Sequence, residues 1–328
     1  MTTTFTPEVL HLDCDAEIAR IGAQMQDIVF TRLRRKGVII AMSGGVDSSV
    51  CAALAVRAFG KEKVLGLLLP EHESAGKSAE LGQVVAEQQG ITFLTEHIGP
   101  ALDALGCYRR RDEAIRNVFP DYNPQWKSKI IIAGGGVAGM TFFKVVVQPP
   151  GGELMEKRLP ARDYLQIVAA TNFKQRIRKN MEYYHGDRLH YAVIGTPNRL
   201  EYDQGFFVKG GDGLADIKPI AHLYKTQVYQ LARHMELPEA VCSARPTTDT
   251  YSLAQTQDEF YFGLPYEKMD VALWCHNHGV TAAALAVTLG MPEAAAQRVY
   301  GDIEAKRRTT AYLHARPALV GVVGEVGR

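Results

Sequence analysis

Apolar residues along the first third of the chain follow two periods, that of a helix and that of a buried strand. Between residues 15 and 35 they recur at helical spacing, which predicts an amphipathic helix. The runs GVIIAM and KVLGLLL are instead continuous stretches of apolar residues, which are typical of parallel strands buried on both faces. The expected elements are helix 15–35, strand 37–42, helix 47–59, strand 63–69, helix 80–89 and strand 91–94. Because strands and helices alternate, we predict a doubly wound, mainly parallel α/β sheet.

The pattern changes after Gly106, where a basic stretch is followed by two β-rich segments and several turn-forming glycines and prolines. We interpret residues 107–162 as an insertion or small β-rich subdomain. The main domain then comprises residues 1–106 and 163–310, and residues 311–328 form a C-terminal tail. Further expected elements are strands 129–132 and 141–147, helix 163–185, strand 191–195, a glycine-rich loop 196–218, helix 226–235 and mostly helix from 266.

Composition narrows the class of protein. The chain has 328 residues, enough for one large α/β domain, and its net charge of +1 argues against a general nucleic-acid surface. It has no apolar run long enough to span a membrane and no secretory signal pattern, so we expect a cytoplasmic protein without a membrane partner. The chain has five scattered cysteines that form no CxxC pair: Cys14, Cys51, Cys107, Cys242 and Cys275. This spacing argues against a zinc site and against a disulfide framework, and it is typical of a protein in a reducing compartment.

The stretch IIAMSGGVDSSVCAAL, residues 39–54, has the features of a phosphate site between a strand and a helix. Gly44 and Gly45 allow a tight turn with positive φ and close approach of a ligand. The unpaired backbone N–H groups at the start of the helix, with its dipole and the hydroxyls of Ser43, Ser48 and Ser49, favour an anion there. Asp47 beside bound phosphates is tolerable mainly if Mg²⁺ lies between them, so the motif also predicts that cofactor.

The motif is neither GxxxxGK[ST] nor GxGxxG, which disfavours a Walker-type site and a dehydrogenase-like dinucleotide site. SGGxDS after an apolar strand resembles the pyrophosphate (PP) loop of N-type ATP pyrophosphatases. That resemblance implies an adenine nucleotide alpha hydrolase-like fold and cleavage of ATP to AMP and pyrophosphate, which activates a carboxyl or carbonyl oxygen. It also implies that ATP is bound by Ala41, Met42, Ser43, Gly44, Gly45, Val46, Asp47, Ser48 and Ser49.

Residues 172–232 resemble the ammonia-dependent NAD synthetases over several motifs at fixed offsets. The motifs are NxKxRxR, an apolar strand ending in GT, a Glu five residues after that Thr, GFxxKxGDGxxD, and a Lys nine residues after its last Asp. Pro246-Thr247-Thr248-Asp249 is similar to the family's PTxD. The resemblance implies a C–N ligase that adenylates the nicotinate carboxylate of deamido-NAD and aminates it with ammonia, giving NAD, AMP and pyrophosphate.

The same resemblance assigns site residues. It implies ATP contacts from Thr196, Lys225 and Thr247, and contacts to deamido-NAD from Arg176, Lys209, Asp216 and Lys306. Asp212 is assigned to positioning or deprotonating ammonia, and with Asp47 and Lys225 it forms the expected catalytic set. Asp47 and Glu201 are the expected Mg²⁺ ligands. Glu201 follows strand 191–195, at the sheet edge where open α/β sheets bind ligands.

The chain departs from the family pattern at several places, and alternatives stay open. Ala305 replaces the His of a motif like HKRRPP, Gly210 replaces a bulky residue, and TPNRLE differs from the TDHAAE of compact enzymes. An amide synthetase of the same fold that uses another carboxylic acid is therefore an alternative. A tRNA-modifying PP-loop enzyme, with the basic run 109–111 as its hook, is less favoured. We recognise no glutaminase domain, so ammonia is expected either free or from a separate glutaminase, and a homodimer is expected.

Overall fold

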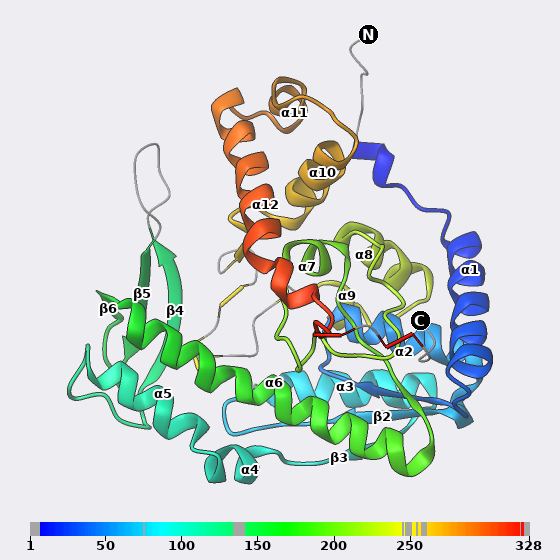
Figure 1. Ribbon diagram of the computed structural model, residues 1–328, viewed down its shortest axis with the longest axis horizontal. Helices are drawn as coiled ribbons and strands as arrows, with labels where there is room; N and C mark the ends of the chain where they lie inside the picture. Colours follow the sequence, from blue (N-terminus) through cyan, green and yellow to red (C-terminus); the bar gives the residue numbers. More distant parts are fainter. Residues whose placement is uncertain are drawn as a thin grey trace.

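The main sheet has four parallel strands in the order β3-β2-β1-β7. They are β1 (Val38–Ala41), β2 (Val64–Leu68), β3 (Thr92–Thr95) and β7 (Ala192–Val193). The computed structural model, shown in Figure 1, describes residues 7–74, 76–133, 142–244, 246, 251–253, 255–256, 261–321 and 323–324. All four strands lie where the apolar runs predicted them.

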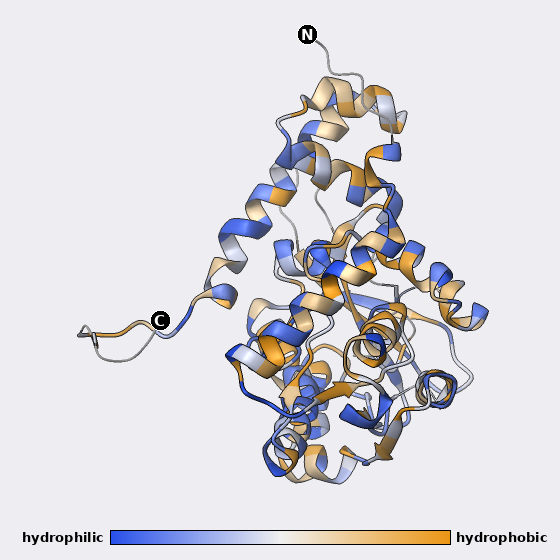
Figure 2. Ribbon diagram, turned by 90° about the vertical axis from the view of Figure 1, so that its right-hand side faces the viewer, coloured by the Kyte–Doolittle hydropathy of each residue, from blue (hydrophilic) through white to orange (hydrophobic). Residues whose placement is uncertain are grey.

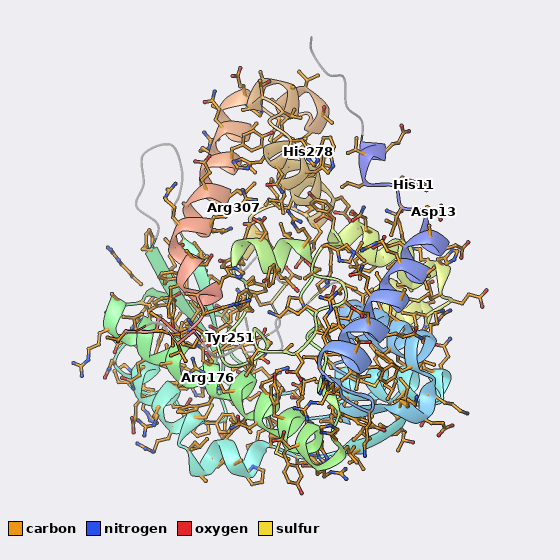
Figure 3. All side chains as sticks on the ribbon, turned by 45° about the vertical axis from the view of Figure 1, so that its right-hand side comes forward. His11, Asp13, Arg176, Tyr251, His278 and Arg307 are labelled. Atoms are coloured by element: carbon orange, nitrogen blue, oxygen red, sulfur yellow. The ribbon has the colours of Figure 1, made fainter. Side chains whose placement is uncertain are left out.

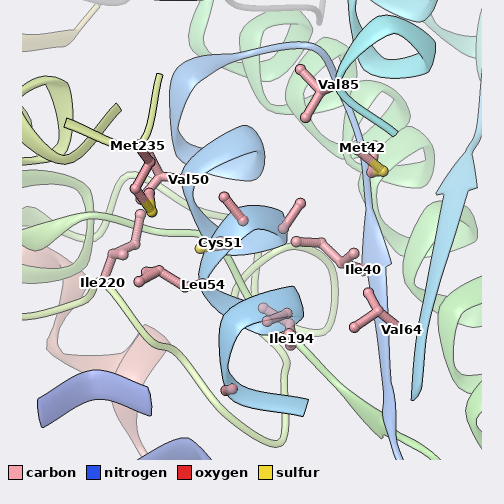
Figure 4. Packing of buried hydrophobic residues seen from close by; sticks show 14 of the residues in the cluster. Ile40, Met42, Val50, Cys51, Leu54, Val64, Val85, Ile194, Ile220 and Met235 are labelled. Atoms are coloured by element: carbon pink, nitrogen blue, oxygen red, sulfur yellow. The ribbon is translucent and has the colours of Figure 1, made fainter. Parts of the chain in front are cut away.

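Helices cover both faces of this sheet. One face packs against α1 (Cys14–Gln26), α2 (Val46–Phe59), α3 (Gly76–Gln89) and α8 (Lys225–His234). The other packs against α4 (Gly99–Ala104), α5 (Cys107–Arg116) and α6 (Ala161–Leu189). Val38 and Ile40 point to the first core, which surrounds α2 in Figure 4, and Ile39 points to the second. This alternation confirms the doubly wound α/β fold.

A second sheet stands apart from the first and is antiparallel. It consists of β4 (Lys127–Ala133), β5 (Phe142–Gln148) and β6 (Met155–Arg158). With α5 and α6 it encloses a small core of its own. The sequence predicted β4 and β5 approximately, but it predicted neither β6, whose side chains are all exposed, nor α5, which begins at Cys107. The proposed division into a main domain and an insertion remains a prediction.

The chain from residue 266 onward is mostly helical, as predicted. Figure 2 shows its helices gathered at one end of the molecule. They share a core with Leu10 of the 3-10 helix η1 (Pro7–Leu10) and with Leu200. The helices of this part are α10 (Tyr266–Asn277), α11 (Ala282–Leu289) and α12 (Glu293–His314). Two shorter helices precede it. The stretch 196–218, predicted as a loop, contains α7 (Arg199–Gln204), whose capping box starts a helix there, and α9 (Glu239–Cys242) packs into the first core. Because α12 runs to His314, it crosses the expected start of the tail at residue 311.

Two short helical segments complete the fold. The predicted helix 15–35 is α1 followed by a π-helical segment, η2 (Asp27–Arg32). A short 3-10 helix, η3 (Lys61–Lys63), precedes β2.

Within the described ranges, no helix is both long and apolar enough to cross a membrane. All five cysteines are free thiols, and all but Cys14 are buried.

Candidate active site

The loop between β1 and α2 forms the floor of the site. Gly44 has φ 75°, and a Cβ there would collide with the backbone oxygen of Ser78. Gly45, the N-cap of α2, has φ −78°, so the prediction of positive φ is right for Gly44 and wrong for Gly45. The hydroxyls of Ser48 and Ser49 donate to the carbonyl of Gly45 at 3.0 and 2.9 Å. These bonds hold the first turn in place and leave its backbone N–H groups available to an anion.

A cavity of about 1020 Å³ opens above this loop and continues along α6 to the second sheet. Residues 41–48, the end of β2 and the stretch 194–197 line one part of it. One face of α6 and the glycine-rich loop around Phe207 line the middle. Ser49 is buried but does not contribute to the lining. The cavity is large for one small molecule, so it suits two nucleotides or one extended one.

Asp47, Lys225 and Glu201 gather in this cavity from three different helices. Lys225, the first residue of α8, is 1% exposed, and its Nζ forms an ion pair with Asp47 Oδ2. Asn198 joins the two acids, because its Nδ2 donates to Asp47 Oδ1 at 3.3 Å and its backbone N donates to Glu201 Oε2 at 3.2 Å. The side chain of Asn198 also caps α7 in a capping box with Glu201, which fixes the position of that carboxylate.

With all three groups ionised, this cluster would carry two negative charges and one positive charge. Burial, and then the charge of Asp47, raises the pKa of Glu201 to about 8. Burial alone would lower the pKa of Lys225, but Asp47 and Glu201 outweigh it and raise that pKa. A further cation beside the two carboxylates would relieve the excess, and carboxylate oxygens suit Mg²⁺. Among the described residues no group of three or more His, Cys, Asp or Glu side chains could hold a metal, so phosphate or water would complete the shell.

A second cluster of charged side chains lies where α6 lines the cavity. Lys179 and Glu182 form a buried ion pair at 2.7 Å and both line the cavity. Asp212, from the glycine-rich loop, lines it as well, and its Oδ1 accepts from the backbone N of Val208 at 2.8 Å. Burial raises the pKa of Asp212 and of Glu182. These carboxyl groups therefore bind protons more readily than exposed ones.

Three other residues assigned from the sequence also line the cavity: Thr196, Arg176 and Lys209. Arg176, labelled in Figure 3, donates from Nε to the carbonyl of Lys209 at 3.3 Å. Lys209 Nζ donates to the carbonyls of Tyr312 and Ala315, at 2.7 and 3.1 Å. The glycine-rich loop is therefore joined on one side to α6 and on the other to the end of α12.

The remaining assigned residues lie elsewhere. Asp216 does not line the cavity, because its carboxylate accepts from the backbone N of Val193 at 2.8 Å and from the hydroxyl of Tyr183 at 3.2 Å. Lys306 also lies outside the lining and donates to the carbonyl of Tyr261 at 2.6 Å. Thr247 falls outside the described residues. Their contacts to substrate stay predictions.

Several cavity residues were not identified from the sequence. Asn198, which is buried outside the cavity lining but bonds Asp47 and Glu201, was not identified either, although Asn-x-x-Glu at a helix start is the capping-box pattern. Lys179 and Glu182 continue the face of α6 that carries Gln175, a helical stripe that extends the NxKxRxR motif. Phe143 and Tyr164 had no such signal, because their place in the lining depends on how the second sheet packs on α6.

Comparisons with known proteins agree on one family. The sequence model for NAD synthase matches residues 17–124 and 140–310. A protein from Mesorhizobium japonicum named NH(3)-dependent NAD(+) synthetase is 55% identical over 318 residues, 97% of this chain and 100% of that protein. One of the same name from Rhizobium meliloti is 52% identical over 323 residues, 98% and 96% of the two chains. The NH3-dependent NAD synthetase structure from Campylobacter jejuni shares the fold, with a TM-score of 0.62, 19% identity, and coverage of 94% of this chain and 100% of that one.

Proposed function

The chain belongs to the NAD synthase family, and we propose that it converts deamido-NAD to NAD with ATP and ammonia. It is a ligase that forms a C–N bond. The observation in the fold that carries this proposal is the cluster of Asp47, Lys225 and Glu201 next to a phosphate-binding loop in one large cavity. That cluster suits a reaction in which pyrophosphate is held and released.

The reaction needs activation, because a free carboxylate is a poor electrophile. The nicotinate carboxylate attacks the α-phosphate of ATP, the bond between the α- and β-phosphates breaks, and pyrophosphate leaves. Ammonia then attacks the carbonyl carbon of the acyl-adenylate, loses a proton, and displaces AMP. Positioning and charge stabilisation can supply most of this catalysis, so no protein nucleophile is required.

The chain's own groups divide this work. The β1–α2 loop offers backbone N–H groups to the phosphates, and Lys225 offers a fixed positive charge to the leaving pyrophosphate. Arg176 and Lys209 supply positive charge to the anionic dinucleotide. The raised pKa of Asp212 makes its carboxylate a better acceptor for the proton that ammonia loses.

Asp47 and Glu201 would hold Mg²⁺, which when bound neutralises charge on the phosphate oxygens of ATP. We also propose a homodimer, since twofold dimers are the commonest closed assemblies of protein chains. Sedimentation velocity measures the mass, and a species of 36.2 kDa at assay concentration would contradict the dimer.

The activity is tested with purified protein, ATP, Mg²⁺, ammonium and deamido-NAD. We expect NAD, AMP and pyrophosphate in equal amounts. Release of ADP would exclude adenylation, and AMP formation only with a different carboxylic acid would establish the alternative substrate. Asp47→Asn and Glu201→Gln should each lower turnover by about 10²-fold or more, since each removes charge at the phosphates. Asp15→Asn and Glu113→Gln, which alter exposed acids in surface ion pairs, are the matched controls.

A further inference from the structure

The inner face of the second sheet continues from a closed core into the active-site cavity. Ile130 of β4 is paired with Val145 of β5, and both are almost fully buried against α5 and α6. The next pair on the same face, Ile132 and Phe143, lines the cavity instead. Ile132 is 39% exposed. The sheet therefore presents apolar surface to the cavity beyond what its own core covers.

Aromatic rings meet at this end of the cavity. Phe143 stacks on Tyr164 of α6, with ring centroids 3.7 Å apart and planes 10° from parallel. Tyr251, labelled in Figure 3, is buried and lines the same region. We call this surface the aromatic wall; its members are Ile132, Phe143, Tyr164, Val168 and Tyr251. It is mainly apolar, and it contrasts with the polar β1–α2 loop at the other end.

The two ends are separated along α6. Figure 1 shows β4 and β5 beside the first half of this helix. Further along, Arg178 donates to the carbonyl of Leu69, at the end of β2, at 3.3 Å. Tyr164 and Arg178 are 14 residues apart in the sequence, which at 1.5 Å per residue corresponds to about 21 Å. A ligand that reaches both the loop and the aromatic wall must therefore be extended.

We propose that the aromatic wall binds the adenine ring of deamido-NAD. This inference rests on the proposed function, which requires the nicotinate carboxylate to lie beside the ATP phosphates at the β1–α2 loop. The other ring of the dinucleotide then lies at the far end of the cavity. Asn172, one turn of α6 beyond Val168, also lines the cavity and carries an amide, the group that pairs with the edge of adenine. The second sheet thus contributes to the selection of a dinucleotide as the acceptor.

The test measures binding by isothermal titration calorimetry with three probes: deamido-NAD, nicotinate mononucleotide and ATP. Phe143→Ala should raise the Kd of deamido-NAD about 5- to 150-fold, the range for loss of one base-stacking contact. The Kd values of ATP and of nicotinate mononucleotide, which lacks adenine, should not change. Phe142→Ala is the matched control, because Phe142 is the neighbouring residue on the opposite face of β5 and does not line the cavity. Phe143→Leu keeps apolar volume without a flat ring and replaces Phe143→Ala if that variant does not fold.

Each other outcome overturns the proposal. An unchanged Kd for deamido-NAD would show that the aromatic wall binds no part of it. A raised Kd for ATP alone would place the adenine of ATP there, and an equal rise for nicotinate mononucleotide would place the pyridine ring there. Failure of the proposed function is distinguishable, because it would show as absence of AMP formation by the wild-type enzyme, whatever the binding data.

Discussion

Lys225 and Lys174 are both 1% exposed, and each is paired with acidic side chains. Lys174, on α6, donates to Glu71 at 3.0 Å and to Glu73 at 2.6 Å. Arg111 of α5 also bonds Glu73, at 2.6 Å. None of these four residues lines the cavity, whereas Lys225 and both of its acidic neighbours do.

The carboxyl groups of the two clusters respond in opposite ways. Burial raises the pKa of Glu73, but the charges of Arg111 and Lys174 outweigh burial and lower it below its ordinary value. Burial and the neighbouring Asp47 raise the pKa of Glu201 to about 8. In the first cluster every carboxylate is paired with a cation within the fold, including Asp112, which Arg111 also contacts. In the second cluster Lys225 pairs with Asp47, and ionised Glu201 would add a second negative charge where a ligand can enter, which is the arrangement expected of a functional site.

The largest effect in this comparison is expected from Lys174→Met. It leaves the buried carboxylate of Glu71 without its ion pair, so the free energy of unfolding should fall by about 3–5 kcal/mol. Urea unfolding followed by circular dichroism measures this change. Lys144→Met is the control, because Lys144 and Glu156 form an ion pair near the surface and its loss should cost about 1 kcal/mol or less. Equal losses in the two variants would remove the distinction between the clusters.

Lys225→Met should show the reverse pattern. Its turnover, measured as pyrophosphate release, should fall about 10²- to 10³-fold, because the leaving pyrophosphate loses a fixed positive charge. The free energy of unfolding should fall less than in Lys174→Met, because Asp47 borders a cavity that water can enter. Lys225→Arg keeps the charge and should retain more activity than the Met variant. Turnover close to that of the wild type in Lys225→Met would exclude this lysine from the reaction.

A smaller effect is expected from the protonation of Asp270, which should make the free energy of unfolding depend on pH. This residue of α10 accepts from the backbone N of Thr226 at 2.7 Å, beside Lys225, and burial raises its pKa from 3.8 to about 6. The folded protein therefore binds more protons than the unfolded chain between these values. Stability contributed by this group is lost as pH rises from about 4 to about 6, by at most about 3 kcal/mol.

Asp270→Asn has no such titration. The difference in urea unfolding free energy between wild type and this variant should therefore change between pH 4 and pH 7, with the wild type losing stability relative to the variant. A constant difference across that range would show that folding does not raise the pKa of Asp270. The buried carboxylate of Asp270, which accepts from the start of α8, would then destabilise the folded protein less than its burial indicates.

Sequence reasoning was most successful where the signal was local. The strands of the main sheet and the loop 43–49 were predicted from contiguous residues, because apolar runs and a glycine turn act over a few positions. It was least successful at α5 and β6. The strand β6 has no buried side chain, so no hydrophobic period marks it. Asp216 shows a different limit of sequence reasoning. Its place in a motif suggested a contact to substrate, but its carboxylate accepts a hydrogen bond from the backbone N of Val193.

The chain's order of apolar runs, its glycine turn and its spaced motifs were sufficient to determine a doubly wound sheet, a tight glycine turn between β1 and α2, and a family. These are properties of short segments, whose conformations depend mainly on neighbouring residues. Tertiary structure decided which buried lysine faces the cavity and which lies within the fold, and it brought Phe143 onto Tyr164 at the far end of that cavity. The place of Lys174 and the stacking of Phe143 depend on how α6 packs between the two sheets, and the place of Lys225 depends on how α8 packs against α2. Packing between distant segments leaves no periodic signal in the sequence.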